Sequence, residues 1–238
     1  IVDNSSSANT FTFQNDPKVL PFSPFAPSRS YSKDVVGGSV YMSGSAGNSL
    51  AYPPEALSSL RSGDFTVEFF WYPINSYGSF PGLFSLGSSS SYSNVLSFGI
   101  SSTSDKRING AIDSGSSADW TTPIGSYKEF TWNHLVLVRS GSASNNCAFY
   151  INGTRTNVFT DTGDIGDGQT SLTLGAQWWD VTNRTAGGYY SNLRVTNNAV
   201  YNPSNTTITV PTAPLSNTNN TLILSKFDSC LIFDKVSM

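Results

Sequence analysis

Short runs of β-branched and aromatic residues, each ended by glycine, serine, asparagine or proline, follow one another along almost the whole chain. The clearest run covers residues 64–72, where every second residue from Phe65 to Trp71 is apolar. Successive side chains of a strand point to opposite faces, so this run predicts a strand with one wholly apolar face, ended by Pro73. The best helical candidate, residues 54–60, is one or two turns long. The chain therefore has to build its core from strands.

Further runs of the same kind are predicted as strands at residues 38–42, 82–86, 95–101, 107–112, 131–139, 148–151, 154–159, 171–174, 188–195 and 221–225. Residues 131–139 are apolar on both faces, so we expect them deep within a sheet. Asn152-Gly153 supplies the two positive-φ residues of a type I′ hairpin turn. Many strands joined by tight turns, without helical crossovers, predict an all-β fold: an antiparallel two-sheet jelly-roll β-sandwich.

The charge balance excludes several classes of partner. Only 12% of the residues are charged, the net charge is −3, and the 13 lysines and arginines are scattered. We therefore expect no nucleic-acid partner. No apolar run approaches the roughly 18 residues of a membrane span, so we expect no membrane insertion. Cys147 and Cys230 have no metal-site spacing, and we expect two free thiols.

No catalytic residue is predicted. Hydrolysis of a glycosidic bond needs two carboxylates about 5–9 Å apart, but Glu68 has no acidic partner at the nearby positions of its strand that share its face, apart from Asp64 at the strand start. A nucleophilic triad would have to use His134, the single histidine, which lies in an apolar run. We expect His134 to be a buried, hydrogen-bonded core residue and the protein not to be an enzyme.

Three segments are expected along the chain. Residues 1–35 are rich in proline and phenylalanine, and we predict an extended arm that lies on the domain or on a neighbouring subunit. Residues 36–226 hold the predicted strands. Residues 227–238 form a C-terminal extension, and Ile232-Phe233-Asp234 echoes Ile1-Val2-Asp3. If the echo is real, the extension is the start of a next unit in a longer tandem-repeat chain.

Five ordered motifs resemble a known family. They are Gly37-Gly38-Ser39-Val40-Tyr41-Met42, Gly63-Asp64-Phe65-Thr66-Val67-Glu68-Phe69, Trp132-Asn133-His134-Leu135-Val136, Tyr150-Ile151-Asn152-Gly153 and Gly188-Tyr189-Tyr190-Ser191-Asn192-Leu193-Arg194-Val195. This set resembles the laminin-G-like domain of the concanavalin A-like lectin/glucanase jelly roll. The resemblance implies that the last strand, residues 221–225, pairs beside residues 38–42.

The C-terminal part carries a narrower resemblance. Asn198-Ala199-Val200-Tyr201, then Val210-Pro211-Thr212-Ala213-Pro214-Leu215, is similar to laminin-G-like units in structural proteins of bacteriophages, notably marine ones. It implies a place on the virion surface, with other virion proteins and further copies of the chain as partners. The alternative location is extracellular or at a cell surface.

One loop could hold a metal ion. Asp161, Asp164 and Asp167 lie at spacing three in a glycine-rich segment, and jelly rolls of this type often carry calcium near the rim. The spacing differs from that of an EF-hand, and Asp-Gly pairs are also common in plain turns. Calcium binding and turn chemistry both remain open.

Carbohydrate binding would use exposed aromatic rings beside amide and charged groups. The candidates gather in one loop, with three more aromatic residues elsewhere: Trp178, Trp179, Asp180, Asn183 and Arg184, with Tyr77, Tyr92 and Trp120. Phe80 lies in the same polar-aromatic loop as Tyr77. Because neighbouring residues of an extended segment face opposite ways, one of Trp178 and Trp179 is expected to be exposed.

These observations favour a non-enzymatic structural, decoration or fibre module of a virion that also binds glycans or another host surface. The alternative is a secreted or cell-surface carbohydrate-binding lectin or adhesin domain, in which calcium would assist the sugar site. In the first case the arm packs against neighbouring copies; in the second the aromatic loop is the binding site.

Overall fold

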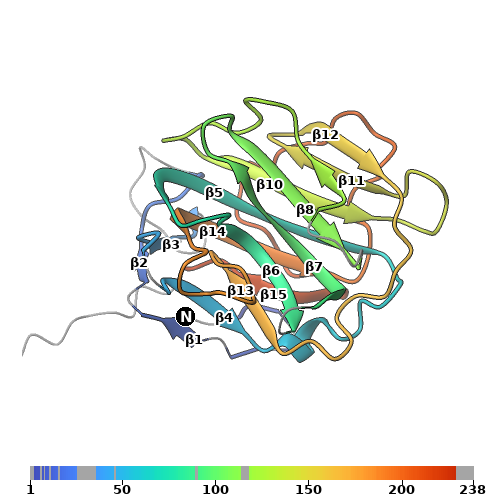
Figure 1. Cartoon of the computed structure of the whole chain (residues 1–238), viewed down its shortest axis with the longest axis horizontal. Coiled ribbons are helices and arrows are strands. Elements are labelled where there is room, and N and C mark those ends of the chain that lie inside the picture. Colours follow the sequence, from blue (N-terminus) through green and yellow to red (C-terminus); the bar gives the residue numbers. More distant parts are fainter. Residues whose placement is uncertain are drawn as a thin grey trace, which may run out of the picture.

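The all-β sandwich predicted from the sequence is confirmed, with two antiparallel sheets packed face to face (Figure 1). The computed structural model describes residues 3–5, 7, 9–10, 12–15, 17–25, 36–45, 47–88, 91–113 and 118–228. Among these residues no helix is both long and apolar enough to cross a bilayer. A single turn of 3-10 helix, η1 (Pro54–Leu57), stands where the sequence predicted a short helix.

The first sheet has seven strands among the described residues. In spatial order they are β1 (Thr12–Gln14), β4 (Ser49–Tyr52), β13 (Ser171–Leu174), β6 (Gly82–Ser88), β7 (Ser91–Ser102), β8 (Arg107–Ile112) and β9 (Trp120–Thr121). Strands β1, β4 and β9, of two to four residues each, were not predicted, since their formation depends on the strands with which they pair.

The second sheet has eight strands in the described part of the chain. They are β12 (Thr154–Phe159), β11 (Cys147–Ile151), β10 (Asn133–Arg139), β5 (Phe65–Tyr77), β14 (Ala186–Thr196), β3 (Ser39–Met42) and β2 (Lys18–Leu20), with β15 (Thr221–Ser225) also paired to β14. Strand β10 lies between β5 and β11 and is buried along its whole length, as its two apolar faces predicted. In Figure 1, β11 and β12 lie on the opposite side of the molecule from β1 and β4.

Two sequence predictions about this sheet were wrong. Strand β5 continues through Pro73 to Tyr77, because β10 ends its pairing at Trp71 and the missing N–H of Pro73 therefore faces no strand. The last strand does not pair beside β3. Instead β3 pairs with residues 188–190 of β14 and β15 with residues 193–196, because β14 is long enough to hold two short strands end to end.

The core lies between the sheets. Phe69 of β5 stacks on Phe98 of β7 with 5.7 Å between ring centres, which joins the two sheets at the middle of the sandwich. Trp71, on the same face of β5 as Phe69, is fully buried. The apolar face predicted for residues 64–72 is thus the core face.

The outer face of the eight-stranded sheet is covered by the chain itself. Phe25 packs against Phe70 at 5.0 Å between ring centres, and Phe22 packs against Tyr189 at 4.8 Å. Farther along, a second apolar cluster on this face is covered by Ala199, Tyr201 and Ile208. The described part of residues 1–35 thus lies on this chain's own domain, while the segment boundaries at 35 and 226 stay predictions.

Candidate functional site

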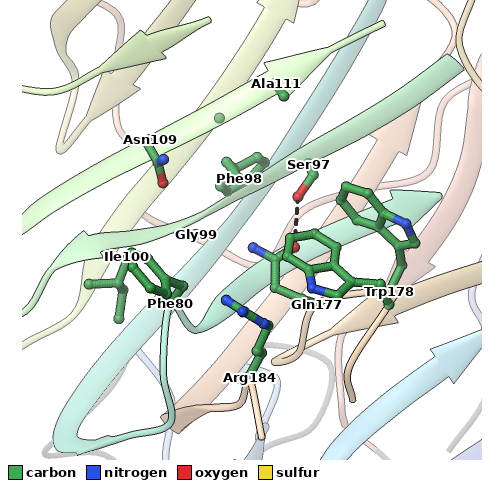
Figure 2. A pocket seen from close by; sticks show the side chains of 12 residues that line it. Phe80, Ser97, Phe98, Gly99, Ile100, Asn109, Ala111, Gln177, Trp178 and Arg184 are labelled. Carbon is green, nitrogen blue, oxygen red and sulfur yellow. Dashed lines mark hydrogen bonds between the residues drawn. The ribbon is translucent and has the colours of Figure 1, made fainter. Parts of the chain in front are cut away.

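A cavity opens on the outer face of the seven-stranded sheet. Strand alternation sends Phe98 into the core and leaves Ser97 and Gly99 of β7 on the outside, where small side chains leave room. The loop that joins β13 to β14 crosses this face and closes one side. The result is a cavity of about 310 Å³ lined by residues of β7, β8, the 176–184 loop and Phe80 (Figure 2).

Glycines let the loop lie directly on the sheet. A Cβ atom at Gly87 of β6 would come within 2.4 Å of the indole ring of Trp178, and one at Gly82 would meet the backbone of Ala176 at 2.5 Å. Close approach of two backbones is a common reason for glycine within a strand. The absence of side chains at Gly82 and Gly87 therefore lets the loop lie this close to the sheet.

Hydrogen bonds fix the loop laterally. Trp178 donates its backbone N–H to Ser85 Oγ at 3.2 Å, so the Ser85 hydroxyl hydrogen is free to be donated to Gln177 Oε1 at 3.0 Å. Ser97 Oγ also lies 3.2 Å from Gln177 Oε1. The carbonyl end of Gln177 is held against the sheet, and Figure 2 shows its amide nitrogen pointing away from Ser97 toward the side of the cavity that holds Phe80.

Aromatic rings surround a single cation at the mouth of the cavity. The guanidinium carbon of Arg184 lies 5.2 Å from the ring centre of Trp179 and 5.4 Å from that of Phe80. Both distances are within the range of a cation–π interaction. Trp179 also contacts Trp178 edge to face, with 4.2 Å between ring centres. One indole of the pair is buried and the other is partly exposed, as predicted for neighbours in an extended segment.

Phe80 is held in an unusual conformation. Its side chain is 63% exposed, and its backbone φ of 47° lies in the left-handed region, which costs a non-glycine residue about 1–2 kcal/mol. Phe130 has the same backbone conformation and a similar exposure away from the cavity, so the position of Phe80 against Arg184, and not its conformation, is what marks it.

Asp180 and Asn183 shape the turn that carries Arg184. Asp180 Oδ1 accepts hydrogen bonds from the backbone N–H and the side-chain amide of Asn183, at 3.0 and 3.1 Å. The backbone hydrogen bond from Asn183, together with the nearby charge of Arg184, holds the pKa of Asp180 below its usual value. These two residues support the loop, and neither lines the cavity.

The three remaining aromatic candidates do not join this group. Trp120 is 5% exposed on the core side of the sheet, with its ring 4.5 Å from that of Phe149. Tyr77 packs partly against the core and donates to Glu129 Oε1 at 3.3 Å, and burial raises its pKa above the usual value. The side chain of Tyr92 lies outside the described residues. The sequence could not separate these rings because strand faces cannot be assigned in short runs.

The carboxylates of the acidic loop, Asp161, Asp164 and Asp167, pair with arginines of the same chain. Asp161 Oδ1 accepts from Arg139 Nη1 at 2.9 Å, and Arg61 forms ion pairs with Asp164 at 3.3 Å and Asp167 at 2.7 Å. Burial raises the pKa of Asp161 against the opposing effect of Arg139. No group of three His, Cys, Asp or Glu side chains suited to a metal ion occurs in the part of the chain that the structure describes. The three carboxylates therefore do not converge on a calcium position.

Glu68 and His134 are buried on the opposite sheet. Glu68 accepts from Arg194 Nε at 2.9 Å and Tyr201 OH at 2.9 Å, and His134 Nε2 lies 3.2 Å from its Oε2. Burial alone would raise the pKa of Glu68, but the hydrogen bond from His134 and the charge of Arg194 outweigh it and lower the pKa. Both side chains are at most 1% exposed, so His134 is the buried core residue that the sequence predicted.

Cys147 is buried as a free thiol, and burial raises its pKa to about 12. Cys230, which is also predicted to be a free thiol, lies outside the described residues.

Sequence reasoning missed much of the cavity floor. Gln177 is not among the predicted binding residues, and Ser97, Gly99 and Asn109 are predicted only as parts of strands. A serine and a glycine at alternate positions of an otherwise apolar strand are a signal that could have marked an open face.

Comparison with known proteins identifies the fold family. Residues 44–222 match the Laminin_G_3 model, described as the concanavalin A-like lectin/glucanases superfamily. A comparison with curated protein sequences found no match.

Several solved structures share the fold. CBM40 of the Ruminococcus gnavus IT-sialidase, solved with α2,3-sialyllactose, aligns with a TM-score of 0.53 and 14% identity over 68% of this chain and 91% of its own. The binding domain of botulinum neurotoxin serotype G aligns with a TM-score of 0.56 and 12% identity over 84% of this chain and 46% of its own. NanB sialidase from Streptococcus pneumoniae aligns with a TM-score of 0.54 and 20% identity over 73% of this chain and 28% of its own. At these identities the likeness concerns the fold alone.

Proposed function

The chain belongs to the concanavalin A-like lectin/glucanase superfamily, and we propose that it is a non-enzymatic module that binds carbohydrate in the cavity of its seven-stranded sheet. One observation carries the proposal: Phe80, Trp179 and Arg184 come together in the lining of a cavity on the outer face of the seven-stranded sheet.

The chemistry of the cavity suits a sugar. A pyranose ring has an apolar face that can stack on an exposed aromatic ring, and hydroxyls that need donors and acceptors at its edge. Trp179 and Phe80 offer the rings, and Asn109 and Gln177 offer side-chain amides. The solved structure of the Ruminococcus gnavus CBM40 with sialyllactose supports carbohydrate as the ligand class on this fold.

The absence of catalysis is part of the proposal. A glycosidase needs two carboxylates beside the bond that it cleaves, and none of the described residues lining the cavity is acidic. Glu68, the strand carboxylate that the sequence drew attention to, is engaged by Arg194 and Tyr201 on the other sheet.

A glycan array tests the proposal. The wild-type chain is expected to bind a subset of glycans, and Trp179→Ala is expected to lose that binding. Trp132→Ala is the matched control, because Trp132 is also a half-buried tryptophan but packs against Phe22 and Tyr72 on the eight-stranded sheet. Equal binding by the wild type and Trp179→Ala, or no binding to any glycan, would overturn it.

We propose as a second role that the module is a structural unit on a virus particle, with its sugar site turned toward the host. The support is the resemblance of residues 198–201 and 210–215 to units of bacteriophage structural proteins. Mass spectrometry of purified particles tests this role. Recovery of the chain only from a cell surface or culture medium would favour the lectin or adhesin alternative.

A further inference from the structure

We propose that the ligand is a carboxylated sugar, such as a uronic or a sialic acid, whose carboxylate is bound by Arg184. The inference rests on the proposed function and adds a ligand class to it. The first observation is the difference between the contacts of Arg184 and those of the other described arginines.

Arg184 differs from the other described arginines in what its guanidinium contacts. Each of the others has a hydrogen-bond or ion-pair acceptor within 3.3 Å in the fold: Arg61, Arg107, Arg139, Arg155 and Arg194. Among the described residues, the acceptor recorded for Arg184 is Asp180 Oδ2, and it lies 4.0 Å from Nε, beyond hydrogen-bond distance. No acceptor among the described residues therefore lies within hydrogen-bond distance of the guanidinium of Arg184.

The position of Arg184 is nevertheless fixed. Its backbone N–H donates to Asp180 O at 3.1 Å, and its carbonyl accepts from Gly82 and Gln177, both at 3.1 Å. The rings of Trp179 and Phe80 hold the guanidinium through their π faces, an interaction that uses none of its N–H groups. The side chain is 26% exposed at the cavity mouth. A positioned guanidinium with free, forked donors matches the geometry of a carboxylate.

The charge around the cavity points the same way. The chain carries a net charge of −3 and 16 acidic residues, yet Arg184 is the one ionisable residue among the described residues that line the cavity. Asp180 balances this charge at 4.0 Å from Arg184 Nε, but it lies outside the cavity lining and its oxygens accept from Asn183. The charged group that lines the cavity is thus a cation.

A second donor accompanies the guanidinium. Because Ser85 donates to Gln177 Oε1, the other end of that amide must be the N–H₂ group. No hydrogen bond uses Gln177 Nε2 within the described part of the chain, and Figure 2 shows it directed toward the cavity. An acidic sugar offers acceptors for both groups and an apolar ring face for Trp179.

Paired probes test the ligand class. Isothermal titration is made with α2,3-sialyllactose against lactose, and with trigalacturonate against its methyl ester, so the two sources of carboxylate are separated. We expect one carboxylated member to bind at least about tenfold more tightly than its neutral partner, since hydrogen bonds to a charged group contribute about 1.5–3 kcal/mol. That preference should shrink as salt is added.

Two variants assign the effect to Arg184. Arg184→Gln is expected to bind the carboxylated probe about 10- to 100-fold more weakly and so to lose the preference for it over the neutral probe. Lys128→Gln makes the same change in net charge at an exposed position outside the cavity lining, and should leave both affinities as they are. Circular dichroism checks that each variant is folded.

The outcomes separate this inference from the proposed function. Equal binding of neutral and carboxylated probes, or an unchanged carboxylate preference in Arg184→Gln, overturns the inference and leaves carbohydrate binding in place. Binding of sulfated but not carboxylated sugars overturns the ligand class. Binding of no sugar at all overturns both proposals.

Discussion

The indole ring of Trp178 occupies the space that a side chain at Gly87 would need, since a Cβ there would lie 2.4 Å from the ring. This contact between a glycine of β6 and the loop before β14 sets how closely the 176–184 loop lies on the sheet. The position of Trp179 and Arg184, and with it the shape of the cavity, depends on it.

Gly87→Ala is therefore expected to lift the loop and abolish glycan binding while the sandwich stays folded. Overpacking of this kind costs about 1–3 kcal/mol of the free energy of unfolding. Urea unfolding and the glycan array measure the two effects. Gly141→Ala is the control, because nothing lies within 4 Å of a Cβ at Gly141 and only its positive φ opposes the change. Full binding by Gly87→Ala would show that the loop does not depend on this contact.

Trp120 and Trp179 are expected to contribute to different properties, the first to stability and the second to ligand binding. Trp120→Ala removes a core side chain and is expected to lower the free energy of unfolding by about 3–5 kcal/mol. Trp179→Ala removes a partly exposed ring and should cost far less stability but lose the ligand. Thermal unfolding beside a binding titration distinguishes them, and a similar loss of stability in both variants would contradict the assignment of their faces.

The buried Glu68–Arg194 pair predicts a specific acid sensitivity. The pKa of Glu68 is lowered in the fold, so its contribution to stability is complete above the ordinary value of 4.5 and is lost as the pH falls through the lowered value. Glu68→Leu leaves Arg194 unpaired and is expected to cost about 3–5 kcal/mol at neutral pH. Urea unfolding between pH 7 and 3 measures both effects.

Replacing both partners supplies the control for that experiment. Glu68→Leu/Arg194→Leu should be more stable than Glu68→Leu alone, because no unpaired charge remains buried. If the single and double variants are equally unstable, the ion pair is not the source of the loss.

Asp3 predicts how the N-terminal segment is held. Its carboxylate is 2% exposed and accepts from the backbone N–H groups of Ser5, Asn9 and Leu224, at 3.0, 2.9 and 2.7 Å. Asp3→Ala leaves these donors without a partner and should release the segment from β15 at a cost of about 1–3 kcal/mol per buried unsatisfied group. Hydrogen exchange at Leu224 is expected to rise, and Asp64→Ala, which removes only the acceptor of the Gly141 N–H, should leave it unchanged.

Removal of calcium gives a simple test of the acidic loop. Because each of its three carboxylates already forms an ion pair with Arg61 or Arg139, a chelator is expected to change neither the melting temperature nor sugar binding. A chelator-dependent fall in melting temperature, restored by calcium, would show that the ion displaces these arginines.

Local patterns were enough to predict the elements of the sandwich. The alternation from Phe65 to Trp71, the two apolar faces of β10 and the Asn152-Gly153 turn are consequences of near neighbours along the chain, so they could be read directly. The short strands β9 and β4 were not predicted, although β13, as short as β4, was; their formation depends more on the partner strand than on their own pattern.

For the candidate site, too, some features followed from the sequence and others only from the tertiary structure. The sequence determined that Trp178, Trp179 and Arg184 share one loop, and that one of the two indoles is exposed. Only the tertiary structure decided that Phe80, about a hundred positions before Arg184 in the sequence, packs against the guanidinium of Arg184. It also decided that Trp120 belongs to the core. It also decided which sheet face is open, since the other is covered by Phe22, Phe25 and Tyr201. Burial and cation–π contacts depend on distances between segments remote in sequence, and strand pairing, sheet packing and the contacts of the 176–184 loop together fix those distances.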